Sequence, residues 1–302
     1  WPPMDYKWVK TIYPPVTQYL LAGTYLLDQS PRRVLLLAMA LNLLCLWPLL
    51  LLMRKRGVPD RWLAIYAWNP LMAHVFATGG HLDPASLFFL LFALYALERQ
   101  RRLGAGALMA LAVMAKTQML FVAPIVLWRS RWRGTVAFFT LAALLTAPFL
   151  SVPLSDLTAG SGAYLGTWEF NSSIFALMQG AFGRGGASLA AALGVGALVA
   201  WLTVHHGDIL VHVPIVLGAL LVLGPTFFPW YLSWVLPFAC LFPNVTLPVA
   251  SFLLLSTWLY TWRGSVGLAA RVPEFLLMYT AGLAEWLIRR RSCRRASLSD
   301  SP

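Results

Sequence analysis

Long apolar runs separated by short polar blocks dominate this chain of 302 residues. Val34–Met53, Gly134–Val152 and Thr246–Trp262 are each long enough to cross a bilayer, because about 20 apolar residues rising 1.5 Å each match a hydrocarbon core of roughly 30 Å. The other apolar runs that continue the alternation are Trp62–Thr78, Ser86–Leu97, Leu103–Ala115, Thr117–Trp128, Ser188–Val204, Ile209–Gly224, Trp230–Phe242 and Pro273–Ile288. The pattern predicts an all-α fold, a multi-spanning membrane helical bundle of about eleven spans.

Several of these predicted spans are short. Ser86–Leu97, Leu103–Ala115 and Thr117–Trp128 have fewer than the roughly 17 residues that a spanning helix needs. Short or broken helices at membrane depth are tolerated where the backbone lines a cavity, so we expect a cavity beside them. Val16–Leu27 fits the alternation poorly. If it crossed the membrane, Arg32-Arg33 and the block that starts at Arg54 would lie on opposite sides. We expect an outer-face or re-entrant helix, and whether it crosses stays open.

The composition excludes a soluble domain and explains the charge. Hydrophobic residues make up 59% of the chain and charged residues 11%, with a mean hydropathy of +0.70, whereas soluble domains carry roughly 25% charged residues. The net charge of +12 sits in blocks between spans: Arg54-Lys55-Arg56, Arg99-Gln100-Arg101-Arg102, Arg129–Arg133 and Arg289-Arg290-Arg291. This is the positive-inside pattern and predicts no nucleic-acid partner. The last basic block marks the boundary between a predicted transmembrane domain, residues 1–288, and a basic cytoplasmic tail, residues 289–302. We expect anionic membrane lipid to hold this tail near the membrane.

Polar residues near helix ends on the predicted outer side are the candidates for chemistry. Tandem prolines suit the first turn of a helix, so Pro14-Pro15 is expected to open one. That would place Tyr13 and Gln18 at a helix N-terminus, where backbone N–H groups attract anions. The plainer alternative is an interfacial helix start with aromatic anchors.

A second outer segment is the turn Thr78–Pro84. Its glycines allow close approach to a ligand, Asp83 is an N-cap candidate, and His81 could contact a phosphate. A capped turn with a solvated histidine is the alternative interpretation.

Lys116 and Gln118 form a third outer segment, between two short apolar runs. A lysine inside a spanning helix costs roughly 2.5–3.5 kcal/mol, and the predicted orientation puts Lys116 opposite the basic blocks. Binding of a phosphate at the membrane surface would explain such a lysine, and snorkelling of the side chain to the interface is the alternative.

Two aromatic segments complete the predicted outer face. Trp168 and Asn171 lie in the long predicted loop Pro153–Ala187, and their mixture of aromatic and amide groups is typical of sugar sites. Trp230 and Tyr231 follow a proline-broken helix end, and an aromatic interface belt would explain them equally. We expect the outer segments to open onto one shared chamber, with Tyr13, His81, Lys116 and Trp230 around it.

The sequence predicts no metal site. His-x-Asp at His81 lacks a third ligand at a suitable spacing, and the pair His205-His206 with Asp208 and His212 falls on the predicted cytoplasmic side, where we interpret it as an inner loop. No cofactor is predicted with certainty, and a requirement for a divalent metal stays open.

Four motifs in a fixed order resemble the GT-C superfamily of membrane glycosyltransferases that use polyprenyl-phosphate sugars, most closely its bacterial mannosyltransferase-like members. They are Tyr13-Pro14-Pro15-Val16-Thr17, Gly80-His81-Leu82-Asp83, Lys116-Thr117-Gln118 and Pro229-Trp230-Tyr231. The resemblance implies transfer of a hexose, mannose-like, from a polyprenyl-phosphate donor to a glycan or lipid acceptor. It places the enzyme in the bacterial plasma membrane, with the active site on the non-cytoplasmic side.

The resemblance also implies a catalytic carboxylate in the first outer loop, well before the Tyr-Pro-Pro motif. Asp5 is the sole acid before Tyr13 and aligns poorly with that residue, so Asp5 is a weak candidate and the catalytic residue is unknown. We expect the first span and most of the first outer loop to be missing. Two alternatives from other classes remain: a transporter or flippase of a lipid-linked substrate, and a non-catalytic membrane subunit.

Overall fold

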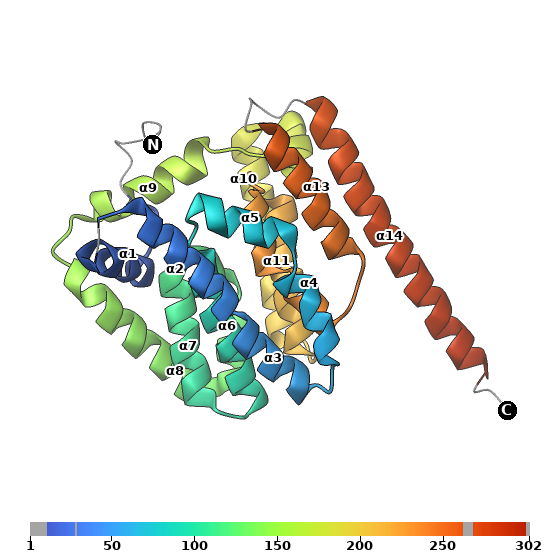
Figure 1. The fold of residues 1–302 in the computed structure, drawn as a ribbon, viewed down its shortest axis with the longest axis horizontal. Coiled ribbons are helices and arrows are strands. Elements are labelled where there is room, and N and C mark those ends of the chain that lie inside the picture. Colours follow the sequence, from blue (N-terminus) through green and yellow to red (C-terminus); the bar gives the residue numbers. More distant parts are fainter. Residues whose placement is uncertain (1–10, 28, 262–267, 300–302) are drawn as a thin grey trace.

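The computed structural model describes residues 11–27, 29–261 and 268–299. Within these ranges the chain forms α-helices and short 3-10 helices and has no β-strand, as Figure 1 shows. An isolated parallel bridge joins Phe170 to Thr226. The predicted all-α class is therefore confirmed.

Prolines determine where the first helices begin and break. α1 (Pro15–Leu27) starts at the second proline of the tandem pair, as predicted, and its 13 residues are fewer than a span needs. α2 (Pro31–Leu44) and α3 (Leu46–Lys55) follow one another across a break at Cys45. Pro48 has no N–H to donate to the carbonyl of residue 44, which accounts for that break.

The predicted span Trp62–Thr78 is divided into three pieces: η1 (Asp60–Leu63), α4 (Ala64–Ala67) and α5 (Pro70–Gly79). The interruption lies at Asn69, whose side-chain oxygen accepts hydrogen bonds from the backbone N–H groups of Leu71 and Met72. Asn69 therefore caps α5, and Pro70 takes the first helical position, where a missing N–H costs nothing.

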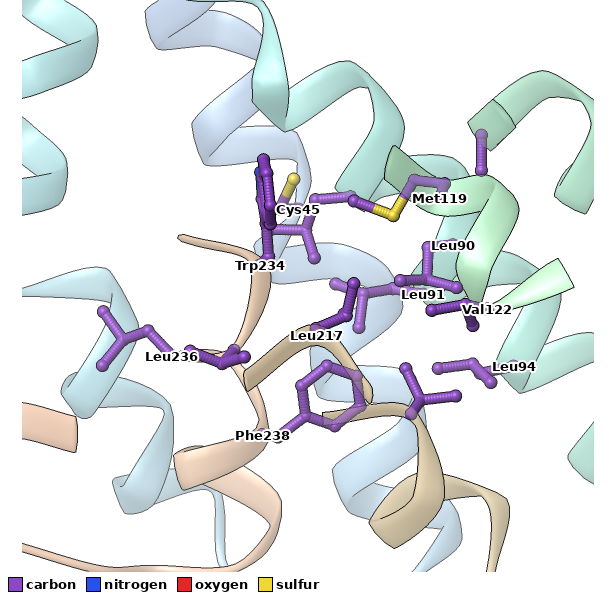
Figure 2. Close-up of a cluster of buried hydrophobic side chains, with 14 of the residues drawn as sticks. Cys45, Leu90, Leu91, Leu94, Met119, Val122, Leu217, Trp234, Leu236 and Phe238 are labelled. Atoms are coloured by element: carbon purple, nitrogen blue, oxygen red, sulfur yellow. The ribbon is translucent and has the colours of Figure 1, made fainter. Parts of the chain in front are cut away.

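Three tightly packed helices form the centre of the molecule: α6 (Asp83–Glu98), α7 (Arg102–Ala115) and α8 (Ala123–Thr146). The 3-10 helix η2 (Thr117–Phe121) joins α7 to α8. Figure 2 shows part of the core, where Leu90, Leu91 and Leu94 of α6 meet side chains from distant segments, among them Leu217 and Trp234. The helices α7 and α8 approach so closely at Gly106 and Gly134 that a Cβ on Gly106 would collide with the Gly134 carbonyl.

That close approach predicts opposite effects for two alanine substitutions on α7. Gly106→Ala is expected to lower the free energy of unfolding by about 1–3 kcal/mol, because the added carbon forces apart two packed backbones. Gly104→Ala on the same helix meets nothing within 4 Å and should raise it by up to about 1 kcal/mol through helix propensity. Denaturant titration of the two variants in detergent checks this, and equal effects would contradict the proposed close contact.

The segment predicted as a long outer loop, Pro153–Ala187, is mostly helical, so that prediction is wrong. It contains α9 (Leu154–Thr167) and the start of α10 (Ile174–Val204), after the short η3 (Ala147–Phe149). Its glycines suggested a loop, but helix packing overrides their low propensity. Gly183, at φ 69°, marks a kink within α10.

Backbone geometry separates two of the predicted spans as expected and alters a third. Thr117–Trp128 and Gly134–Val152 were expected as separate spans, and α8 is interrupted between them at Arg131, whose φ of 58° and ψ of −166° are not helical, so two helices meet there. The expected span Trp230–Phe242 consists instead of the 3-10 helix η4 (Pro229–Trp234) and the short α12 (Phe238–Leu241). Pro237, between these two helices, has no N–H to donate to the carbonyl of residue 233, which prevents a continuous helix there.

The last three long helices are α11 (Ile209–Leu223), α13 (Thr246–Thr261) and α14 (Leu268–Ser299). α14 packs against α13 at the edge of the bundle (Figure 1). It continues helically through the described part of the predicted tail, so the tail is not an irregular segment as far as Ser299.

Three helical segments of the described residues are long and apolar enough to cross a membrane: Pro31–Lys55, Ala123–Phe149 and Ile174–Val204. The shorter apolar helices include Arg102–Ala115 and Ile209–Leu223. The expected count of about eleven spans is not confirmed. Large apolar side chains are nevertheless widely exposed, with Leu26 at 84% and Trp68 at 87%, which suits a protein surrounded by lipid.

Ion pairs hold the basic end of the bundle together. The Arg56 guanidinium, just after α3, donates to both carboxylate oxygens of Glu98 at the end of α6 and of Asp208 before α11, all at 2.8–2.9 Å. Arg129 donates to the carbonyls of His205 and Gly207. The histidine pair thus lies in a structural loop at this end, and the described residues contain no cluster of three or more metal-ligating side chains.

Candidate functional site

A buried ion pair lies at the opposite end of α6 and α7. Lys116 Nζ is 3.1 Å from Asp83 Oδ1 and 3.2 Å from Asp83 Oδ2. Asp83 is fully buried and Lys116 is 5% exposed. The indole Nε1 of Trp234 donates a further hydrogen bond to Asp83 Oδ1 at 2.9 Å. Each carboxylate oxygen therefore has a charged or polar donor, as a buried charge requires.

Local backbone geometry places both charges at helix ends. Lys116 follows the last residue of α7 in an extended conformation, φ −152°, which turns the chain into η2. Gly80, at φ 63°, ends α5 in the left-handed region that glycine favours. Asp83 is the first residue of α6 and Leu82 occupies the N-cap position, so the interpretation of Asp83 as an N-cap is wrong: its carboxylate serves Lys116 and Trp234 instead.

Aromatic rings surround the lysine ammonium. Lys116 Nζ lies 5.5 Å from the ring centre of Tyr13, 5.1 Å from that of Tyr231 and 5.9 Å from that of Trp234. These are cation–π distances, and such contacts are strongest away from water. The Thr17 hydroxyl, on α1, donates to the Ala115 carbonyl at 2.7 Å, so α1 and Tyr13 are held against the end of α7.

A cavity of about 610 Å³ opens beside this lysine, within the size range of ligand pockets. Tyr13 and Tyr231 lie closest to the ammonium among its polar lining. The other polar lining residues are Thr117, Gln118, Ser161, Tyr164, Ser188 and Thr226. Its apolar lining comes chiefly from η2, α10 and α11: Leu120, Phe121, Ala191, Ala192, Val195, Leu220 and Leu223. The cavity thus combines a cationic, hydroxyl-rich end with a long apolar wall.

Tyrosine hydroxyls connect the polar end to neighbouring segments. The Tyr164 and Tyr231 hydroxyls are 3.1 Å apart, and Tyr164 also hydrogen-bonds to the Thr226 hydroxyl. The Phe170 carbonyl accepts a hydrogen bond from the backbone N–H of Phe227, the residue after Thr226, at 2.7 Å. The α9–α10 connection and the segment before η4 are therefore joined next to the cavity, which Tyr164 and Thr226 line.

His81 and Trp230 lie beside the cavity but are not among its lining residues. Their rings stack at 3.5 Å between centres, and the stack continues through Phe228, 4.5 Å from Trp230, to Phe170, a further 4.6 Å away. Tyr13 and Lys116 line the cavity, as expected, but the expectation that His81 and Trp230 also open onto it is wrong. Those two rings stack on one another and on Phe228 instead.

The remaining predicted residues are distributed unevenly. Gln18 donates its amide to the Tyr13 carbonyl at 2.8 Å, which fixes the turn before α1. Trp168 packs against Tyr164, 5.5 Å between ring centres. Asn171 is buried, and its amide donates to Glu274 of α14 at 3.0 Å. Asp5 lies outside the described residues.

Two residues of the site were not singled out in the sequence. Trp234 lies only four positions after the Trp230 that was, and its hydrogen bond to Asp83 depends on the 3-10 geometry of η4. Tyr164 lies in the segment expected to be a loop. No local signal marks it, because its role depends on contacts across 62 and 67 positions.

The pKa of His81 is lowered from 6.5 to about 4, chiefly because burial disfavours the charged imidazolium; the Asp83 carboxylate opposes this shift and the Lys116 ammonium contributes to it. The folded protein therefore binds a proton here less readily than the unfolded chain. The contribution of His81 to the free energy of unfolding is therefore fully present above pH 6.5 and is lost as the pH falls toward 4. The melting temperature should drop as the pH is lowered from about 7 to about 5.

His81→Asn should reduce that pH dependence, whereas His206→Asn in the exposed loop at the basic end should preserve it. Thermal unfolding in detergent at several pH values checks both variants. An unchanged slope in His81→Asn would show that His81 is not buried in this way.

Comparison with known families settles the class of protein. Residues 11–223 match glycosyltransferase family 87, a GT-C-type family of membrane enzymes. The chain belongs to glycosyltransferase family 87. The match covers more than two thirds of the 302 residues, and the resemblance drawn from the four motifs is confirmed at this level. No curated protein matches the chain.

Membership in family 87 makes the chain a membrane glycosyltransferase. The matched region includes Tyr13, Asp83 and Lys116, and it ends at the last residue of α11. Trp230, Tyr231 and Trp234 lie beyond it and are connected to it by the contacts described above.

Proposed function

We propose that this family 87 enzyme transfers a hexose, mannose-like, from a polyprenyl-phosphate donor to a glycan or lipid acceptor on the non-cytoplasmic face of the membrane. The observation that carries the proposal is that Lys116 is the one charged residue lining a largely apolar cavity, as far as the described residues go. A polyprenyl phosphate has the same division, with one anionic group on a long hydrocarbon chain.

The proposed fit assigns each part of the donor to a part of the cavity. The hydrocarbon lies along the apolar wall, for example at Leu120 and Leu223. The phosphate lies at Lys116, with the Tyr13 and Tyr231 hydroxyls and the Gln118 amide as further donors. Donors of this kind stabilise the charge that develops on a departing phosphate.

Asp83 acts in this proposal as a positioning residue. Its oxygens contact Lys116 and Trp234, and it is absent from the cavity lining. The ammonium has three N–H donors, so Asp83 can fix its place while leaving a donor for the phosphate. The cavity lining drawn from the described residues contains no carboxylate, so we assign the general base, which deprotonates the acceptor hydroxyl, to none of them.

The proposed orientation follows from the two ends of the bundle. The basic blocks after α3 and α6 and within α8 lie at one end, and the Lys116 cavity lies at the other, separated by α7. Because basic loops remain cytoplasmic, the cavity faces the opposite side in a multi-pass topology.

The test uses the full-length protein in sealed vesicles of known orientation, supplied with labelled polyprenyl-phosphate mannose or with GDP-mannose. We expect label to reach an acceptor from the polyprenyl donor only, and only when the acceptor is on the non-cytoplasmic side. Transfer from the nucleotide sugar would contradict the proposal. Movement of the intact labelled lipid across the bilayer without transfer would favour a flippase instead.

A further inference from the structure

The basic end of the bundle has more cations than its carboxylates can pair. Asp60 is paired with Arg54, with 2.8 Å between Oδ2 and Nη2. Glu98 and Asp208 are both paired with Arg56. These three carboxylates therefore already form ion pairs with Arg54 or Arg56, and none of them pairs with the arginines at the neighbouring helix ends.

A second cavity, of about 480 Å³, lies at this end. Three arginines line it from two helices: Arg101 and Arg102 at the start of α7, and Arg133 in α8. The other lining residues are Gln100, Leu103 and Gly104. Among the described residues, no carboxylate forms an ion pair with any of these three arginines.

Three guanidinium groups around one hollow repel one another unless an anion lies between them. Two turns bring the arginines together. Gln100, at φ 57°, closes the end of α6, where the N–H of Arg101 donates to the Ala96 carbonyl. Arg131, at φ 58°, separates the two helical parts of α8 just before Arg133.

Apolar side chains beside the cavity indicate what kind of anion fits. Leu103 is 64% exposed and Trp132 is 69% exposed. Trp128, on the other side of the helix break at Arg131, is 60% exposed. Tryptophans with exposed apolar surface beside arginines are typical of the boundary between lipid chains and headgroups. A soluble anion would gain nothing from this apolar border.

We propose that the Arg101–Arg102–Arg133 cavity binds the headgroup phosphate of an anionic phospholipid. The arginines contact the phosphate, since guanidinium groups bind phosphate oxygens through paired hydrogen bonds. The acyl chains lie along Leu103 and Trp132. The cavity is separated from Lys116 by the length of α7, about 21 Å for its 14 residues, so it is a site distinct from the proposed donor cavity.

The test measures lipid binding to the purified full-length protein by native mass spectrometry, with phosphatidylglycerol and phosphatidylcholine as probes. The cavity variant replaces all three arginines with glutamine: Arg101→Gln, Arg102→Gln and Arg133→Gln. The matched control removes three exposed cations of the same end that do not line the cavity: Lys55→Gln, Arg61→Gln and Arg99→Gln. Both variants lose the same formal charge, so general attraction to anionic lipid changes equally.

We expect the cavity variant to weaken phosphatidylglycerol binding by at least about 10-fold and the control to change it far less, with phosphatidylcholine binding unaffected in both. Equal losses in the two variants would overturn the proposal, because they would show only general electrostatic attraction. Displacement of the lipid by millimolar inorganic phosphate would overturn the lipid assignment in favour of a free anion. The readout does not depend on sugar transfer, so it stands or falls separately from the proposed function.

Discussion

The double variant Lys116→Met/Asp83→Asn is expected to fold and to transfer sugar at least about 100-fold more slowly than the unaltered full-length enzyme. Removing both charges together leaves no unpaired charge in the buried site. Methionine keeps most of the length of the lysine side chain, and asparagine still offers an oxygen to the Trp234 indole. The loss of rate therefore reports on the ammonium and its role at the donor phosphate. Initial rates with a saturating polyprenyl-phosphate donor measure it.

An exposed ion pair at the other end of the bundle supplies the matched control. Arg54→Met/Asp60→Asn removes the same two charge types, and this pair is more than half exposed on both side chains. Its transfer rate should stay close to that of the unaltered enzyme. A normal rate in the Lys116 double variant, or an equal loss in the control, would contradict the assignment of Lys116 to the donor phosphate.

Asp83→Ala is expected to lower the free energy of unfolding by about 3–5 kcal/mol, because it leaves the Lys116 charge buried without its counter-ion. The Trp234 indole N–H also loses its acceptor. Denaturant unfolding in detergent micelles measures the change. Lys116→Met should also lower the free energy of unfolding, because it leaves the Asp83 carboxylate buried without its counter-ion.

The same unfolding measurements on the Lys116→Met/Asp83→Asn double variant complete a mutant cycle. The double variant should lose clearly less free energy of unfolding than the sum of the losses in the two single variants, because removing both charges leaves no unpaired charge in the buried site. Additive costs would mean that the two side chains do not interact as the structure describes.

Sequence patterns within a few residues correctly predicted the structural features that depend only on neighbouring residues. The tandem prolines located the start of α1, and Lys116 was correctly placed in the turn between α7 and η2. The apolar composition identified a helical membrane protein. The motif order led to the GT-C resemblance, which the family 87 match confirms.

Features that depend on distant contacts were not predictable in this way. The pairing of Lys116 with Asp83 joins residues 33 positions apart, and the Trp234 bond to Asp83 spans 151. The sequence therefore showed Lys116 as an isolated cation, although it has a buried counter-ion. Apolar runs also did not reveal where prolines would shorten a helix, as they do in η4.

The central claim is that the cavity beside Lys116 holds the donor lipid, and photo-crosslinking tests it most directly. The full-length enzyme would be irradiated with a polyprenyl-phosphate sugar that carries a diazirine on its first isoprene units, and the adducts mapped by mass spectrometry. We predict adducts on the apolar wall, at Leu120, Phe121, Leu220 and Leu223, that a tenfold excess (roughly 90% occupancy at equal affinity) of unlabelled donor suppresses. Adducts confined to exposed outer surfaces such as Leu43 and Trp47, insensitive to that excess, would contradict the account.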